Sequence, residues 1–357
     1  MATHDYVIDN STGANVRSDI NNALQAILTN NSSGSAPSTT AAYMLWADTS
    51  NNILKMRNSA NDGWIDLRTL TGGLTSAADA TINSITVGKG ANSVAGNTVL
   101  GESALDASVS GGENTAIGAE ALTTLTSGTS NVAVGHDALK LNTTGGSNTA
   151  IGNAALDANT TASNNVAVGA DALGANTTGH SNTAVGHSSL GASSTGLYLT
   201  AVGLGALASN TTANNSTAVG RNALTLNTTG AHNTAVGMNS LDANTTGANN
   251  SGVGLDALGA NTTGESNSAL GSGALDANTT ASHNTAVGKD SLGVNTTGSQ
   301  LVALGSRALE SNTTASNNVG IGYSAVRENT TGTQNVGIGT DALKLNTTAS
   351  NNTACGY

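Results

Sequence analysis

The sequence predicts a mainly β protein whose larger part is a parallel β-roll or β-helix, a solenoid in which each rung of chain stacks on the previous one. The first observation is a glycine that follows an apolar residue and recurs at every seventeenth position from Gly101 to Gly356, without insertion or deletion. A strict period of this length is typical of solenoids. The second is composition: 45 Gly in 357 residues, with 9% charged and 2% aromatic side chains, does not match an ordinary globular enzyme.

Within a rung numbered from this glycine, apolar positions alternate as they do in strands. Position 17 is always apolar, position 5 is almost always Leu, and positions 4 and 16 are small. Positions 15 and 17 share one face of a first strand, and positions 5 and 7 share one face of a second. Asn-Thr-Thr at positions 8–10 and the residues after the glycine are suited to bends. Charged residues avoid positions 4, 5, 16 and 17, so we expect two strands per rung around an uncharged, apolar inside. Its lining would include Val134, Leu139, Ile151, Leu156, Val168 and Leu173.

A single copy of this solenoid has a thin core. Burial of one Leu and one Val or Ile per rung contributes roughly 3–6 kcal/mol. Ordering the backbone costs about 1–2 kcal/mol per residue, and the chain has no Phe and two Trp. Small residues at positions 4 and 16 would let a second surface approach closely. We therefore expect a homotrimer, with a shaft on the order of 75 Å long at about 4.8 Å per rung.

Residues 1–70 are not part of the repeat. Residues 1–35 form an expected helical segment, because Val16, Ile20 and Leu24 follow a helical spacing that extends over residues 15–29. Residues 36–70 predict an antiparallel β-meander with strands near 43–48, 53–57 and 64–68. The meander holds both tryptophans, Trp46 and Trp64, which would either pack in its core or contact a partner.

Residues 71–100 form the transition to the 17-residue-repeat shaft of residues 101–357. An apolar-Gly phrase ends at Gly88, which lies closer to Gly101 than one full rung, so a shortened first rung is expected. Atypical terminal repeats commonly start a solenoid. At the far end the last rung stops at Tyr357 before it is completed, and an open rung exposes unpaired backbone groups. A distal cap or receptor-binding protein, or a terminal fold-back, is expected to cover it.

Composition excludes several functional classes. A net charge of -11 and a pI near 4.7 argue against nucleic-acid binding. The start of the chain lacks a basic region followed by an apolar run, so no signal peptide is expected, and no apolar run approaches a membrane span. The lone Cys355 occupies position 17 and is expected to be a small core hydrophobe, with no intrachain disulfide.

No residue constellation predicts catalysis, a cofactor or a metal. Asn-x-Thr recurs in most rungs, but a stacked Asn/Thr bend is the simpler interpretation than a glycosylation site. Adjacent threonines such as Thr143 and Thr144 would point apart, which disfavours ice binding. His136 and His187 lie three rungs apart, roughly 14 Å, too far for a shared metal. Asp242 and Asp256 could meet across rungs as in a glycosidase, so polysaccharide cleavage remains an alternative, although the same acids also serve to keep the surface hydrated.

Two resemblances favour an adhesive fibre. Residues 114–118 (Asn-Thr-Ala-Ile-Gly) and 182–186 (Asn-Thr-Ala-Val-Gly), each followed two residues later by Ala-Leu or Ser-Leu, resemble the head repeats of trimeric autotransporter adhesins. That resemblance covers residues 80–357 and implies a left-handed β-roll in a homotrimer. The period in that family is commonly shorter, so the Asn-Thr-Thr bend is a departure. A bacterial surface adhesin of this type is one functional alternative.

The N-terminal part is similar to the virion-anchoring end of tail fibres from short-tailed phages. The resemblance lies in residues 16–22 (Val-Arg-Ser-Asp-Ile-Asn-Asn), 46–48 (Trp-Ala-Asp), 54–58 (Leu-Lys-Met-Arg-Asn) and 64–65 (Trp-Ile). It implies a non-enzymatic structural virion protein, assembled in the host cytoplasm. Its expected partners are a phage tail or adaptor protein and a host surface receptor. The expected virion-docking residues are Val16, Ile20, Trp46 and Trp64.

Overall fold

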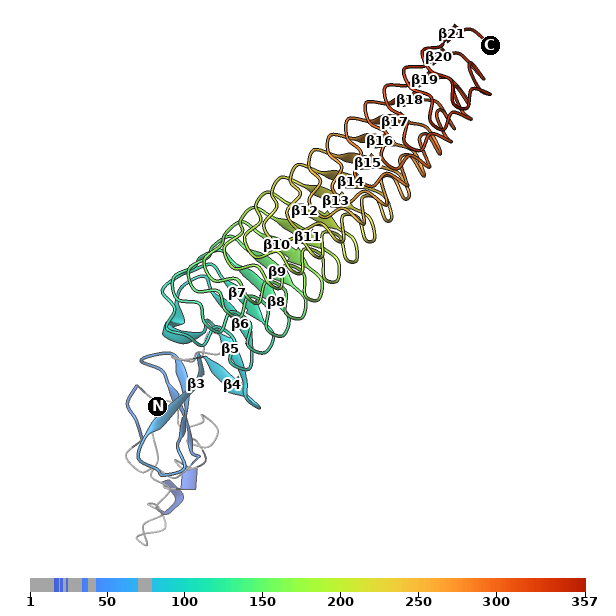
Figure 1. Cartoon of the computed structure of the whole chain (residues 1–357). Coiled ribbons are helices and arrows are strands. Elements are labelled where there is room, and N and C mark those ends of the chain that lie inside the picture. The colour runs from blue at the N-terminus through green and yellow to red at the C-terminus, as the bar shows by residue number, and fades with distance from the viewer. Residues whose placement is uncertain (1–15, 19, 22–23, 25–33, 38–42, 70–78) are drawn as a thin grey trace. The chain divides into compact units, whose positions relative to one another are not determined.

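The computed structural model describes residues 16–18, 20–21, 24, 34–37, 43–69 and 79–357. The chain divides into two compact units, Met1–Ala80 and Thr81–Tyr357. The first unit holds a small antiparallel sheet and the second a parallel β-solenoid, so the protein is mainly β, as predicted (Figure 1).

The sheet of the first unit is the predicted meander. Its strands are β1 (Leu45–Asp48), β2 (Ile53–Arg57) and β3 (Trp64–Thr69), paired antiparallel in the order β1-β2-β3. Positive-φ asparagines lie in both connecting turns, Asn52 at 57° and Asn61 at 57°. Asparagine tolerates this conformation well, so turn chemistry and strand patterning agree here.

The predicted N-terminal helix is described only in part. Residues 16–18, 20–21 and 24 are helical, and both Ile20 and Leu24 are exposed. The other residues of the predicted segment 15–29 lie outside the described part of the chain.

The second unit stacks sixteen parallel strands in sequence order, one in each rung of the repeat, from β6 (Thr98–Gly101) to β21 (Thr353–Cys355). Each strand residue pairs with its equivalent in the next rung, as Ala167 does with Ala184. The strands between the two ends are β7 (Thr115–Ile117), β8 (Val132–Val134), β9 (Thr149–Ile151), β10 (Val166–Val168), β11 (Thr183–Val185), β12 (Thr200–Val202), β13 (Thr217–Val219), β14 (Thr234–Val236), β15 (Ser251–Val253), β16 (Ser268–Leu270), β17 (Thr285–Val287), β18 (Val302–Leu304), β19 (Val319–Ile321) and β20 (Val336–Ile338).

The predicted second strand of each rung is wrong. Positions 2–7 form turns, in which positions 3 and 5 have positive φ, as Asp137 (60°) and Leu139 (53°) do. The backbone still bonds to the next rung, since the Leu139 N–H donates to the Ala155 carbonyl oxygen at 3.0 Å. A left-handed leucine is unfavourable by about 1–2 kcal/mol, which complete burial of the side chain offsets. Because left-handed residues alternate with others in this turn, the apolar positions 5 and 7 have the same period-2 spacing as in a strand.

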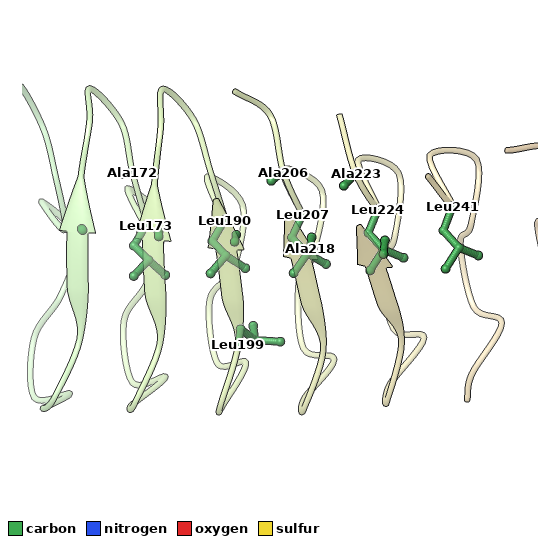
Figure 2. Packing of buried hydrophobic residues seen from close by; sticks show 14 of the residues in the cluster. Ala172, Leu173, Leu190, Leu199, Ala206, Leu207, Ala218, Ala223, Leu224 and Leu241 are labelled. Carbon is green, nitrogen blue, oxygen red and sulfur yellow. The ribbon is translucent and has the colours of Figure 1, made fainter. Parts of the chain in front are cut away.

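The apolar lining of the solenoid comes from positions 4, 5 and 16. Leu139, Leu156 and Leu173 are fully buried, as predicted. Figure 2 shows such leucines stacked in one row, with alanines beside them. The alanine at position 16 is also fully buried, as at Ala133 and Ala150.

Position 17 does not line the inside, which corrects three predicted core residues. Val134 and Val168 are half-buried and Ile151 is 40% exposed. Because strand side chains alternate, an inward position 16 places positions 15 and 17 on the outer face. From β7 to β21 the inward position 16 is Ala or Gly, and the larger aliphatic side chains of position 17 face outward. Cys355, also at position 17, is exposed for the same reason.

The inside also contains two columns of buried asparagine. It is therefore uncharged, as predicted, but it is not wholly apolar, and the prediction of an apolar inside is wrong in this respect. At position 8, Asn261 Nδ2 donates to Asn244 Oδ1 at 2.8 Å and to the Gly264 carbonyl oxygen at 3.1 Å. At position 14, the Asn250 N–H donates to Asn233 Oδ1 at 2.9 Å. Each ladder therefore satisfies buried polar groups across rungs, which confirms the stacked asparagine bend. The amides of the position-8 sequons are thereby buried and hydrogen-bonded.

Residues 91–101 stack on the next rung, as a short first rung would, but the strand that ends at Gly88 is not a parallel rung strand. Strand β4 (Ala80–Ile82) is followed by β5 (Ile85–Gly88), which runs antiparallel to β6, with Val87 opposite Leu100. The chain then reverses through the 3₁₀ turn η1 (Ala91–Ser93), whose Ala91 N–H donates to the Leu105 carbonyl oxygen at 3.1 Å. Strand β5 therefore covers the free edge of β6, which is the first strand of the parallel stack. At the other end, the pairing described for β21 is with β20.

Candidate functional site

The outer face of the solenoid sheet is the largest candidate interaction surface. Positions 15 and 17 of strands β6 to β21 form two parallel columns, and neither column contains a charged residue. The first column is Thr, Ser or Val, and the second is Val, Ile or Leu until Cys355. Leu100, Ile151, Val236, Leu270 and Ile338 of the second column are the most exposed of its aliphatic side chains.

This face is continuous, because every strand pairs in register with its neighbour. One shallow apolar hollow interrupts it, lined by Ser251, Val253, Ser268, Ala269, Leu270 and Val287. Serine replaces the more usual threonine or valine at two successive strands, and the missing methyl groups leave the hollow beside Leu270. An extended uncharged face of this kind marks a protein interaction surface more often than a hydrated one.

Charged residues lie on the turns instead. Lys140 Nζ contacts Glu120 Oε2 at 2.5 Å and Asp137 Oδ1 at 3.0 Å. The hydrogen bond to Glu120, with that to Asp137, raises the pKa of Lys140. Glu120, His136 and Asp137 have ligand atoms within 4.8 Å of one another, a spacing that a metal ion could use. The Lys140 ammonium contacts both carboxylates and offsets one of their two charges, so the cluster already holds a cationic group where a metal ion would sit.

Three aspartates at position 6 have raised pKa values. Burial is the main cause for Asp157, Asp242 and Asp276, and neighbouring carboxylates add to it. For Asp242 the added charge is that of Asp256, the pair considered above for polysaccharide cleavage. Asp256 Oδ1 accepts a hydrogen bond from Asn239 Nδ2 at 3.1 Å. The two carboxylates thus influence each other, and neither lines the described hollows.

In the N-terminal sheet, the tryptophans pack together. The ring centroids of Trp46 and Trp64 are 5.2 Å apart, and Lys55 and Arg57 lie over the two rings. Trp46 is 5% exposed, so of the two interpretations above it takes the core one, while Trp64 is half-buried. Of the other two predicted docking residues, Ile20 is exposed and Val16 is half-buried.

Asp48 is two residues after Trp46 in β1 and therefore lies on the same side of the sheet. Burial acts to raise the pKa of Asp48, but hydrogen bonds from Asn51 and the ion pair with Lys55 outweigh burial and lower it. Asn51 Nδ2 donates to Asp48 Oδ2 at 2.9 Å, and Lys55 Nζ lies 3.4 Å from the same oxygen. The side chains on the tryptophan side of the sheet therefore interact mainly with one another.

The opposite side of the N-terminal sheet is more exposed than the sequence pattern indicated. Leu45 pairs with Met56, and Met56 pairs with Ile65, so the three side chains form one row. Leu45 and Ile65 are both exposed. The sequence signal for this row is that Leu45 and Ile65 are next to the two tryptophans in their strands, so they face the opposite side of the sheet.

The outer face of the solenoid was likewise misassigned, and its signal was the size difference between neighbours. Small alanines flanked by β-branched residues indicate a narrow inside and a broad outside. Among the described residues, no helix has the length and apolar character needed to cross a membrane. Comparisons with models of protein families, with curated proteins and with solved structures find no match.

Proposed function

We propose that this protein is the homotrimeric tail fibre of a short-tailed bacteriophage, a non-enzymatic virion protein. Residues 1–70 would anchor it to a tail or adaptor protein, and the solenoid would project towards a receptor on the host surface. The single observation that carries the proposal is the uncharged outer face of sixteen in-register strands. A rigid, extended repeat with an apolar seam is suited to a multi-chain shaft, and it has no evident catalytic centre among the described residues.

The outer face supports self-association better than hydration. Val, Ile and Leu at position 17 would meet the same column in neighbouring copies, and the threonines of position 15 would flank this seam. Symmetric packing of identical surfaces is the commonest route to homo-oligomers. The three-fold choice comes from the resemblance to trimeric adhesin heads. In this arrangement, position 17 supplies a core that is shared between chains rather than enclosed by one chain.

Sedimentation and light scattering test the assembly. A trimer has three times the chain mass of 34.8 kDa, about 104 kDa. Val236→Glu places a charge on the outer face and is expected to give monomers, because burying an unpaired charge is costly. Thr229→Glu adds the same charge in the same rung at an exposed turn and should remain trimeric. A wild-type mass equal to that of one chain would exclude the trimer.

Cys355 offers a second, independent reporter. It lies at the outer position 17 of β21 and is exposed. In a trimer packed through position 17 in register, the three thiols converge, and a short bis-maleimide should link chains. Cys355→Ser should abolish the cross-link, and a wild-type chain that stays uncross-linked at a trimeric mass would place the seam elsewhere.

The virion role needs its own test. Antibodies against residues 1–70 and against the solenoid should label purified virions at the tail, with the solenoid label farther from the capsid. Absence of the protein from purified virions would remove the tail-fibre assignment even if the trimer is correct.

A further inference from the structure

One rung departs from the repeat both inside and outside. It begins at Gly186 and ends at Val202. Inside it, Ser193 replaces the position-8 asparagine and Leu199 replaces the position-14 asparagine. As a result, the buried Asn176 Oδ1 has no hydrogen-bond partner in the described structure, whereas Asn142 and Asn159 each accept a hydrogen bond from the asparagine of the next rung. The rung thus departs from the hydrogen bonding that stabilises its neighbours.

Outside, the same rung carries Tyr198 at position 13. This position has positive φ in every rung from 113 onward, and Tyr198 has φ 56°. The other rungs from there on place Ser, Asn, His, Gln or Glu at position 13. Small or polar residues tolerate the left-handed region, whereas a bulky aromatic residue is an outlier. Tyr198 is nevertheless 56% exposed, so burial does not offset its conformation.

The Tyr198 ring is held by a second aromatic residue. His180, from the previous rung, contacts it edge-to-face, with centroids 5.4 Å apart and planes at 88°. The Tyr198 N–H also lies 3.4 Å from the His180 carbonyl oxygen. On the other side, the Leu197 N–H donates to Asn214 Oδ1 at 2.7 Å, which fixes the turn before the tyrosine. The ring pair is therefore ordered by both neighbouring rungs.

The surroundings of this pair are polar but uncharged. Ser181 and Asn215 occupy position 13 of the rungs before and after Tyr198, and Thr195 precedes it on the same exposed turn. These side chains offer hydroxyl and amide groups, and none carries a formal charge. An aromatic pair contact returns a stabilisation of the same order as the cost of left-handed strain, so the pair does not evidently stabilise the fold. Departures from local conformational preference are expected at functional or strained sites.

We propose that Tyr198 and His180 form a binding site for a neutral carbohydrate on the side of the solenoid. The apolar C–H face of a pyranose ring packs on the Tyr198 ring, and its hydroxyls pair with Thr195 and Asn215. Ser181 Oγ lies 3.3 Å from His180 Nδ1 and supports the histidine ring. The uncharged surroundings and the net charge of -11 disfavour an acidic glycan. In the host attachment proposed above, this site would make a neutral carbohydrate the class of receptor that the fibre binds. The biological meaning of the site rests on that proposed function. Binding itself is measured independently of it.

Saturation-transfer NMR on the full chain tests the site directly. The probes are methyl glucoside, methyl galactoside, methyl mannoside, N-acetylglucosamine and dextran. We expect transfer to the ring protons of at least one probe, and Tyr198→Ser should lower its affinity at least tenfold. Tyr198→Phe should retain most of the affinity. Tyr323→Ser removes a similarly exposed tyrosine from a different turn and should bind as the wild type does.

A purely structural role would give a different result. If Tyr198 only stabilises its rung, Tyr198→Ser lowers the melting temperature and leaves any sugar signal unchanged. The proposal expects an unchanged or higher melting temperature, because serine is already found at position 13 of other rungs. No transfer to any probe, or transfer unaffected by Tyr198→Ser, overturns the site. Neither result alters the sedimentation mass or the virion label, so the fibre proposal stands or falls separately.

Discussion

Asn261 Nδ2 donates a hydrogen bond to Asn244 Oδ1 at 2.8 Å, across one rung of the solenoid. Both side chains are fully buried. The same nitrogen bonds to the Gly264 carbonyl oxygen, and Asn261 Oδ1 accepts from Asn278 Nδ2 at 2.9 Å. Asn261 is therefore both donor and acceptor in a ladder that runs along the inside.

Replacing Asn261 with alanine is expected to lower the free energy of unfolding by about 2–4 kcal/mol. The change removes three hydrogen bonds, each contributing about 1 kcal/mol, and leaves buried partners unsatisfied. Chemical denaturation monitored by circular dichroism measures the loss. Thr263→Ala, an exposed change in the same rung, should alter stability by less than about 0.5 kcal/mol. Equal effects of the two substitutions would contradict a structural ladder.

Ser193→Asn should stabilise the protein by about 1 kcal/mol. An asparagine there can donate to the unpartnered Asn176 Oδ1 and restore the ladder. Leu199 in the same rung does not block it, because Asn295 fits in the rung of Leu301 and donates to Asn278 Oδ1 at 3.2 Å. Thermal unfolding is the measurement, with the exposed Thr195→Asn as control. An unchanged melting temperature would mean that water already satisfies Asn176.

Gly254→Ala should destabilise the solenoid severely, by roughly 3 kcal/mol or more. An added Cβ would lie 2.5 Å from the Gly271 carbonyl oxygen, and φ is +137°. Gly259→Ala in the same rung is the matched control, because its nearest neighbour is Asp276 Oδ1 at the end of a movable side chain. Soluble yield and unfolding midpoint compare the two. A fully stable Gly254→Ala protein would contradict the close approach of successive rungs.

Asp276→Asn should raise stability at neutral pH. Burial, followed by the charges of Asp256, Asp242 and Asp290, raises the folded-state pKa of Asp276 above its ordinary value of 3.8. The folded chain then binds more protons than the unfolded chain between these two values, so the free energy of unfolding falls as pH rises through that interval. Removing the charge should recover at most about 1 kcal/mol, because solvent screens this exposed group.

The difference between Asp276→Asn and wild type should shrink as pH falls and disappear well below 3.8, where the carboxyl is protonated in both states. Glu265→Gln changes the net charge equally and tests for a general charge effect. Melting temperatures across pH 3–8 provide the measurement. A gain that persists unchanged at the acidic end would assign the effect to packing instead of ionisation.

The stacking of rungs and the meander were predictable because both depend on local, repeated signals. The glycine period set the length of one rung, and turn residues such as Asn52 separated strands of suitable composition. The direction of side chains was less predictable. Val134 and Ala133 are adjacent, and hydrophobicity alone assigns the larger one to the inside. The narrow interior reverses that choice, and only the size pattern of the whole column signals it.

Left-handed leucines and buried asparagines were hidden for a related reason. Leu139 at φ 53° contradicts the usual preference of leucine, so no local propensity predicts it. Asn261 belongs to a residue type that is usually exposed, yet stacking on an identical neighbour satisfies its amide inside. Both effects arise between rungs, where a pattern within one rung carries no information. Tyr198 was missed because a single exception is easily overlooked in a regular repeat.

The uniformity of the ladders has a consequence for folding. A rung that skips its proper neighbour and stacks on the next one meets almost the same leucine, alanine and asparagine, so misregistration by one full rung is penalised only weakly by the repeated positions. Ser193, Leu199 and Leu301 are different, because each replaces an asparagine of one of the two ladders. The irregular residues thus distinguish rungs that are otherwise interchangeable, and they favour the correct register of stacking.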